Sequence, residues 1–176
     1  QIDMVNYILD SHPLKVTGMG GINYWKDGRD TYDNIRTIYE YPNGIKSGVT
    51  SVLSNAYNGY SIRILGDKAT VEILREKAFI YSETLDNAKG IVDGVTGATL
   101  ALTTQGKPIE LIFEKEGQPQ LEPTIYALQH FVECIHDKKK PVSSVETAKD
   151  TSIAIHMGNK AADTETLQVW KPEYSV

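Results

Sequence analysis

The sequence predicts an α+β fold, with an open, mostly antiparallel β-sheet and helices packed on one of its faces. An apolar repeat of helical period opens the chain, short alternating strands separated by turn residues fill its middle, and two further helical repeats follow. The chain has 176 residues, of which 23% are charged, and a net charge of -5. This is ordinary for one globular domain with its own core, so residues 1–176 are expected to form a single domain.

The first helix is predicted near the N-terminus, where Ile2, Val5, Ile8 and Leu9 recur at helical spacing. It should end before Pro13, because a proline disfavours helical conformation in the residue before it. A strand over residues 14–19 follows, and then a polar loop, WKDGRDTYD.

A meander of four or five antiparallel strands is predicted next. Its first hairpin, IRTIYEY and IKSGVTSVL, flanks Pro42-Asn43-Gly44, because proline favours turn entry and glycine accepts a positive φ. The following segments, YSIRILG, ATVEILR and KAFIYSE, alternate like half-buried strands. Residues 84–105 are predicted as a long loop with one weak strand, and KPIELIFEK as a further strand.

Two helices and a short strand complete the predicted fold. The first helix starts at Pro123, ends before Pro141, and carries one apolar stripe: Ile125, Leu128, Phe131, Val132 and Ile135. Ser143 and Glu146 suggest a capping box for the second, whose small residues allow close approach to another element. If the helices pack on one face of the sheet, the other face must be covered by a partner or be unusually polar.

Several function classes lack support in the sequence. The acidic balance disfavours nucleic acid as the main partner, and no apolar run approaches the length of a membrane span. The four histidines share no metal-ligating spacing, and Gly18-Met19-Gly20-Gly21 is better explained as a strand end than as a phosphate loop. No catalytic residue and no metal site are therefore predicted, and localisation stays open because an export signal would precede Gln1.

Two polar sets are candidates for substrate binding. Asp3, Asn6 and Tyr7 share one face of the first helix, although a solvated face would look the same. The stretch NAYNGY joins two strands and offers amides and aromatic rings, which suit sugars because rings stack on apolar sugar faces and amides bond hydroxyls. Tyrosines are also simply good strand formers. The residues of this second set are Asn55, Tyr57, Asn58 and Tyr60.

The order of elements and several short stretches resemble the C-terminal domain of the Gfo/Idh/MocA oxidoreductases, whose fold is like that of dihydrodipicolinate reductase. The stretches are QIDMVNYIL, YWKDGRDTYDN, YEYPNG, NAYNGYSIRILGDKATVEI, ALQHFVECIHDKKKP and TLQVW. Members of that family are NAD(P)-dependent enzymes acting mostly on sugars and polyols. In them the first helix usually begins with His, two residues and Asp. Asp3 resembles that Asp, and the His would precede Gln1.

The resemblance implies a role for this chain as one wall of a substrate crevice. The opposite wall would be an N-terminal Rossmann domain, absent here, that holds NAD or NADP and the family's catalytic Lys. No cofactor is expected in this chain alone. Tyr60 resembles a tyrosine that lines the pocket in polyol-oxidising members, and the loop with Trp25, Arg29 and Asp33 is a further candidate wall. The open sheet face implies a homo-oligomer.

Three functions remain open from the sequence. The first is the substrate-binding and oligomerisation half of an NAD(P)-dependent sugar or polyol oxidoreductase, inactive alone. The second is a stand-alone, non-catalytic binding or dimerisation module, since no complete catalytic set is present. The third is a member of the same family that uses NAD to cleave glycosides.

Overall fold

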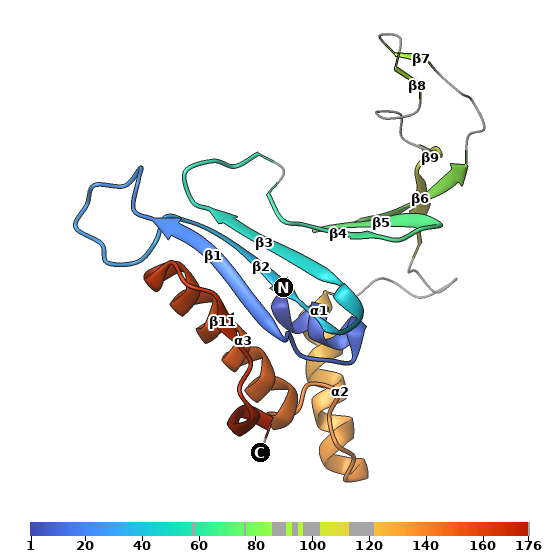
Figure 1. Ribbon diagram of the computed structural model, residues 1–176. Coiled ribbons are helices and arrows are strands. Elements are labelled where there is room, and N and C mark those ends of the chain that lie inside the picture. Colours follow the sequence, from blue (N-terminus) through green and yellow to red (C-terminus); the bar gives the residue numbers. More distant parts are fainter. Residues whose placement is uncertain are drawn as a thin grey trace. The chain divides into compact units, whose positions relative to one another are not determined.

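The computed structural model of the chain describes residues 1–57, 59–75, 77–85, 91–92, 95–96, 103–112 and 122–175. The chain divides into two compact units, residues 1–56 with 121–176 and residues 57–120. Both are drawn in Figure 1. The predicted α+β class is confirmed, with open antiparallel sheets and helices on one sheet face. The assignment of residues 1–176 to a single domain stays a prediction.

The first unit holds a four-stranded antiparallel sheet in the order β11-β1-β2-β3, together with the α-helices of the described chain. The C-terminal strand therefore pairs beside the first strand, with Val16 opposite Gln168. The elements of this unit are α1 (Ile2–Leu9), β1 (Lys15–Gly21), β2 (Asn34–Glu40), η1 (Pro42–Gly44), β3 (Lys46–Val52), α2 (Pro123–Asp137), α3 (Val145–Thr164), β11 (Gln168–Val169) and η2 (Pro172–Ser175).

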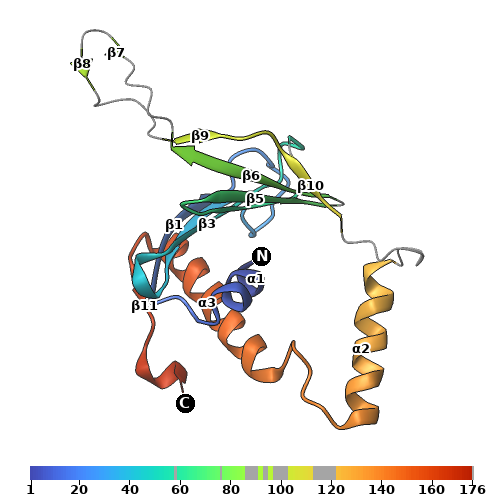
Figure 2. The ribbon, with the colours of Figure 1, turned by 90° about the vertical axis from the view of Figure 1, so that its right-hand side faces the viewer.

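The core of the first unit lies between α3 and the inner face of the sheet, as Figures 1 and 2 show. Val16 of β1 and Tyr39 of β2 are register partners whose side chains pack with Ala154, Met157 and Ala161 of α3. Small residues on α3 let the helix approach the sheet closely, as the sequence predicted. Since strand residues alternate between faces, Met19 and Ile38 lie on the opposite face and are exposed.

The hairpin predicted at Pro42-Asn43-Gly44 is confirmed, and it closes as a short 3-10 turn. Asn43 and Gly44 both have positive φ, 61° and 74°, which asparagine and glycine tolerate best. Pro42 precedes them where its fixed φ suits the turn entry. The turn pairs β2 and β3 in a register that sets Glu40 opposite Lys46.

The predicted capping box of α3 is wrong by one residue. Ser144, and not Ser143, is the N-cap, and Thr147 takes the place expected for Glu146. The Thr147 hydroxyl accepts a hydrogen bond from the Ser144 backbone N–H at 2.9 Å. In a typical capping box a glutamate side chain accepts this bond. Glu146 instead forms an ion pair with Lys140 at 3.0 Å.

The second unit is built on an antiparallel sheet in the order β10-β6-β5-β4, with β9 also pairing with β6. It contains the strands predicted from YSIRILG, ATVEILR, KAFIYSE and KPIELIFEK, and the region predicted as a long loop contributes β7, β8 and β9. Its elements are β4 (Ser61–Leu65), β5 (Ala69–Leu74), β6 (Ala78–Leu85), β7 (Ile91–Val92), β8 (Val95–Thr96), β9 (Thr103–Gln105) and β10 (Ile109–Leu111).

Candidate functional site

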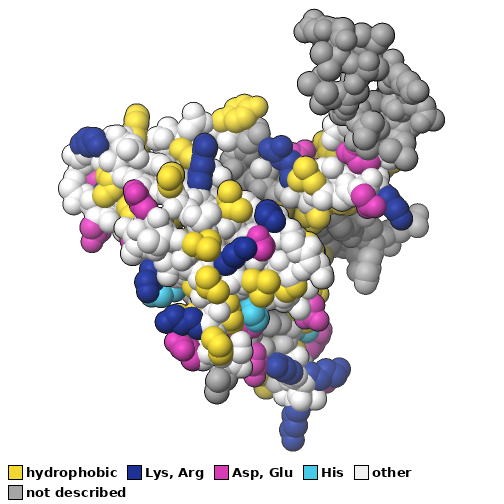
Figure 3. All heavy atoms as spheres, in the orientation of Figure 1, with side chains coloured by type: hydrophobic (Ala, Val, Ile, Leu, Met, Phe, Trp, Pro, Cys, Tyr) yellow, Lys and Arg dark blue, Asp and Glu magenta, His cyan; other side chains and the backbone are white. Residues whose placement is uncertain are grey.

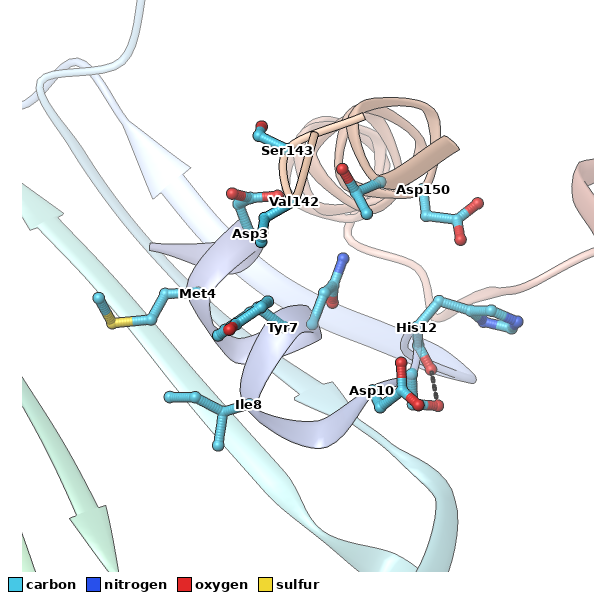
Figure 4. Close-up of a pocket in the computed structure, with 12 residues that line it drawn as sticks. Asp3, Met4, Tyr7, Ile8, Asp10, His12, Val142, Ser143 and Asp150 are labelled. Atoms are coloured by element: carbon cyan, nitrogen blue, oxygen red, sulfur yellow. Dashed lines mark hydrogen bonds between the residues drawn. The ribbon is translucent and has the colours of Figure 1, made fainter. Parts of the chain in front are cut away.

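A pocket of about 990 Å³ lies in the first unit, beside α1 and the beginning of α3. Figure 4 shows Asp3, Met4, Tyr7 and Ile8 projecting from α1. Val142 and Ser143, from the segment before α3, line the same pocket. All three residues of the first predicted set, Asp3, Asn6 and Tyr7, line this pocket; its other polar lining residues are Asp10, Ser11, His12, Ser143, Thr147 and Asp150.

Asp3 and Asn6 are joined by a third side chain that the sequence analysis missed. Thr151 of α3 donates its hydroxyl to Asp3 Oδ1 at 2.9 Å and accepts from Asn6 Nδ2 at 3.4 Å. On the other side, the hydroxyl of buried Tyr41 donates to Asn6 Oδ1 at 2.7 Å. The polar face of α1 is therefore attached both to α3 and to the end of the sheet.

No local pattern in the sequence links Tyr41 and Thr151 to α1, because they lie 35 and 145 positions from Asn6. The hydrogen bonds leave Asn6 with both ends of its amide engaged inside the protein. Asp3 keeps one carboxylate oxygen, Oδ2, outside the bond to Thr151. Of the two, Asp3 is thus the better placed to accept a hydrogen bond from a ligand hydroxyl.

The electrostatics of the pocket suit a neutral, hydroxyl-bearing ligand. Asp3, Asp10 and Asp150 supply three carboxylates, against one imidazole from His12. Carboxylates accept hydrogen bonds from hydroxyl groups but repel the phosphates of a dinucleotide. His12 is further held by its ring, which stacks on Trp170 with centroids 3.9 Å apart. The described residues of this chain therefore do not fit a dinucleotide at this pocket.

The polar loop after β1 is organised around Asp33. This side chain is only 2% exposed, and its oxygens accept from the backbone N–H groups of Tyr24 at 2.8 Å and Trp25 at 2.9 Å. Asn34 Nδ2 and the Asn23 N–H also donate to it, at 2.8 and 3.2 Å. These donors, the Asn34 amide first, hold the pKa of the Asp33 carboxyl well below its usual range.

Asp33 therefore stabilises the loop from inside, and Trp25 and Arg29 are the candidate residues that reach the surface. The Arg29 guanidinium lies 5.2 Å from the centre of the Trp25 ring and bonds both carboxylate oxygens of Asp27. The hydrogen bond from Arg29 lowers the pKa of Asp27 to about 2. Tyr32 ties the loop to α3 by donating to Asp163 at 2.8 Å.

The second predicted set is divided between the units. Asn55 follows β3 in the first unit, whereas Tyr57 and Tyr60 precede β4 in the second. All three side chains are exposed. Asn58 lies outside the described residues. The joining of this set with Asp3 and Asn6 in one site stays a prediction.

The described residues contain neither a metal-binding cluster nor a membrane-spanning helix. No group of three or more His, Cys, Asp or Glu side chains in this part of the chain is arranged to hold a metal ion. None of its helices has both the length and the apolar character needed to cross a membrane. On the face shown in Figure 3, Lys and Arg are interspersed with Asp and Glu over the coloured surface.

Comparison with known sequences decides the family. The profile of the Gfo/Idh/MocA oxidoreductase family, C-terminal alpha/beta domain, matches residues 1–166. The chain belongs to this family. No curated protein matched the chain. The resemblance seen in the sequence is thus confirmed for nearly the whole length of this Gfo/Idh/MocA domain.

Solved structures share the fold of this Gfo/Idh/MocA domain at low sequence identity. Aldose–aldose oxidoreductase from Caulobacter crescentus, complexed with glycerol, is 20% identical with a TM-score of 0.64, and the match covers 96% of this chain and 44% of that one. An NAD-binding protein from Listeria innocua is 17% identical with a TM-score of 0.65, covering 96% and 49%. Levoglucosan dehydrogenase, in complex with NADH and levoglucosan, is 13% identical with a TM-score of 0.67, covering 96% and 47%. The chain therefore spans about half the length of the structures it matches.

Proposed function

We propose that this chain is the substrate-binding and oligomerisation domain of an NAD(P)-dependent sugar or polyol oxidoreductase, and that it is inactive alone. The observation that carries the proposal is the family match over residues 1–166. Similar folds in a levoglucosan dehydrogenase and an aldose–aldose oxidoreductase support sugars as the substrate class. The carboxylate-lined pocket beside α1 agrees with a ligand rich in hydroxyl groups.

In this proposal the cofactor belongs to an N-terminal Rossmann domain of the same protein. The described residues offer carboxylates where a dinucleotide would need donors, so NAD or NADP is expected to bind elsewhere than on this chain. The cofactor supplies the redox chemistry, and this chain supplies substrate contacts. The proposed substrate-binding residues are Asp3, Asn6, Asn55, Tyr57, Asn58 and Tyr60. Asn6 contributes by fixing α1 through its hydrogen bonds to Thr151 and Tyr41.

The oligomerisation part of the proposal rests on the outer sheet face. Met19 and Ile38, on the face opposite α3, are 73% and 54% exposed. Polar residues lie beside them: Arg36 is the register partner of Met19, and Thr50 is the register partner of Arg36. A sheet face that combines exposed apolar side chains with polar ones can form an interface with a second copy of the chain.

The test uses the full-length protein and follows reduction of NAD or NADP with a panel of sugars and polyols. We expect Tyr60→Ala to raise KM or lower kcat while leaving the folded structure intact, as monitored by circular dichroism. Leu65→Ala is the matched control, because Leu65 is also exposed in the second unit but lies at the far end of β4. An unchanged kcat/KM in Tyr60→Ala would remove this tyrosine from the site, and absence of turnover with every sugar would contradict the proposed substrate class.

A further inference from the structure

The pocket beside α1 extends along the whole helix. Asp3 lies in the first turn of α1 and His12 lies two residues beyond Asp10, the C-cap, yet both line this pocket. Figure 4 shows Asp3 and His12 at opposite ends of the helix. At 1.5 Å per residue, α1 separates Asp3 from Asp10 by about 10 Å. The volume of about 990 Å³ is at the upper end of the range for small-molecule sites.

The imidazole of His12 is held in one tautomer. Its Nδ1 lies 3.2 Å from the carbonyl oxygen of Pro13, and because a carbonyl oxygen can only accept, Nδ1 carries the hydrogen and donates it. In the neutral ring, Nε2 is then a hydrogen-bond acceptor. Every buried side-chain nitrogen or oxygen among the described residues has a partner, so Nε2, which has none there, is accessible to solvent.

A second contact fixes the plane of the ring. The His12 and Trp170 rings are stacked, with centroids 3.9 Å apart and an interplanar angle of 16°. Trp170 donates its backbone N–H to the Leu14 carbonyl at 2.8 Å, and its indole N–H donates to Ser175 Oγ at 3.1 Å. The Tyr174 ring packs edge-on against the indole, with centroids 5.6 Å apart. The direction of Nε2 is therefore set by the fold before any ligand binds.

We propose that the His12 end of the pocket is a second sugar subsite, and that the substrate of the full-length protein is a disaccharide or a longer saccharide. This inference rests on the proposed function. A single sugar ring is too short to contact Asp3 and His12 together, whereas two linked rings span the length of α1. Nε2 of His12 accepts a hydrogen bond from a hydroxyl of the second ring, and Trp170 is a positioning residue that holds the imidazole for this bond.

The first experiment compares matched sugars as substrates of the full-length protein, with NAD or NADP. Glucose, galactose and xylose are each paired with a disaccharide that carries the same terminal unit: cellobiose, lactose and xylobiose. We expect the wild type to have the higher kcat/KM with the disaccharide of a pair. His12→Asn keeps a polar group near Nδ1 but has none at Nε2. It should raise the KM for the disaccharide about three- to tenfold more than the KM for the monosaccharide.

Two further substitutions and a control make this result specific. His12→Gln, whose longer side chain reaches the Nε2 position, should lose less affinity for the disaccharide than His12→Asn. Trp170→Leu removes the stacked ring and should raise the same KM, whereas Trp170→Phe keeps a flat ring and should restore it. His156→Asn, at an exposed position of α3 outside the pocket, should behave like the wild type. Equal effects of His12→Asn on both sugars of a pair would overturn the subsite.

A second experiment observes the imidazole nitrogens directly and needs no turnover. The full-length protein is labelled with ¹⁵N-histidine, and the His12→Asn variant identifies the His12 signals in the NMR spectrum. In the neutral ring we expect a protonated Nδ1 and an unprotonated Nε2. Cellobiose, lactose or xylobiose should shift the Nε2 signal, and the monosaccharides should not. The opposite tautomer, or no shift with any disaccharide, would overturn the subsite.

The two experiments together separate the subsite from the proposed function. A protein that oxidises monosaccharides, but whose His12 signals respond to no disaccharide, keeps the proposed function and loses the subsite. A protein whose Nε2 signal responds to a disaccharide, while no sugar reduces NAD or NADP, keeps the subsite and loses the redox function.

Discussion

A methyl group added at Gly158 should destabilise the protein, although alanine is the better helix former. Gly158 lies within α3 and faces Tyr39 of β2. A Cβ at this position would collide with the Tyr39 hydroxyl, which donates to the Ala154 carbonyl at 3.2 Å. This contact fixes how closely α3 approaches the sheet, and Thr151 lies two turns earlier on the same helix.

The magnitude follows from two opposing effects. Alanine in place of glycine in a helix interior gains about 1 kcal/mol, whereas overpacking a core costs about 1–3 kcal/mol. The Tyr39 ring is buried on the sheet and its hydroxyl is hydrogen-bonded, so it has little room to move. The difference is a net loss of about 0–2 kcal/mol, and because Tyr39 has little room to move we expect Gly158→Ala to lower the free energy of unfolding by about 1–2 kcal/mol, the upper half of that range.

Without the Tyr39 hydroxyl, the methyl group added at Gly158 should no longer destabilise the protein. In Tyr39→Phe the nearest atom to the new Cβ is Cζ at 3.2 Å, followed by Thr37 Cγ2 at 3.6 Å, and a shift of a few tenths of an ångström relieves the contact. Tyr39→Phe alone should cost about 1 kcal/mol for the lost hydrogen bond. The double variant should be at least as stable as Tyr39→Phe, so the two substitutions are strongly coupled.

The assay is urea unfolding followed by circular dichroism for the wild type, both single variants and the double variant. Asn159→Ala, at an exposed neighbouring position on α3, is the control for helix propensity and should be slightly stabilising. If Gly158→Ala is as stable as the wild type, or if the two single effects simply add, the close contact between α3 and Tyr39 is not what sets the packing distance.

Two further predictions concern the loop and α1. The folded-state pKa of Asp33 is lowered, so its contribution to stability is present above the unfolded pKa, near 4, and is lost as pH falls through the range below that value. Thermal denaturation should show stability falling more steeply between about pH 4 and 2 in the wild type than in Asp33→Asn, which is less stable at neutral pH; identical slopes would contradict the assigned hydrogen bonds. Thr151→Val removes the hydroxyl between Asp3 and Asn6 and should cost about 1 kcal/mol, with faster hydrogen exchange of α1 amides, whereas Thr151→Ser should behave like the wild type. Unchanged exchange in the valine variant would show that Thr151 does not hold α1.

Local patterns in the sequence were sufficient for most elements. The helical repeat of Ile2, Val5 and Leu9 predicted α1, and Pro42-Asn43-Gly44 predicted the hairpin, because both depend on residues close together in the chain. The capping box was displaced by one residue since adjacent serines offer the same local signal, and the choice depends on which neighbour supplies the second hydrogen bond. The stripe on α2 was predicted, but its exposure was not.

The candidate site could be predicted only in part. Asp3 and Asn6 were identified from their shared helical face, and Asp3 also from the family resemblance; both line the pocket. Thr151 and Tyr41 were missed because sequence separation hides a contact that folding creates. Asp33 was expected at a cleft, yet it is buried beneath its own loop, since a carboxylate can accept several backbone N–H groups at once.

The sequence by itself determined the α+β class, the turn chemistry and the family of this protein, because these depend on residue order and local conformational preference. Only the tertiary structure decided which side chains hold α1, that the apolar stripe of α2 is left exposed and which polar side chains are hydrogen-bonded inside the protein. Those properties depend on distances between residues far apart in the chain, and such distances are settled by packing and not by local sequence.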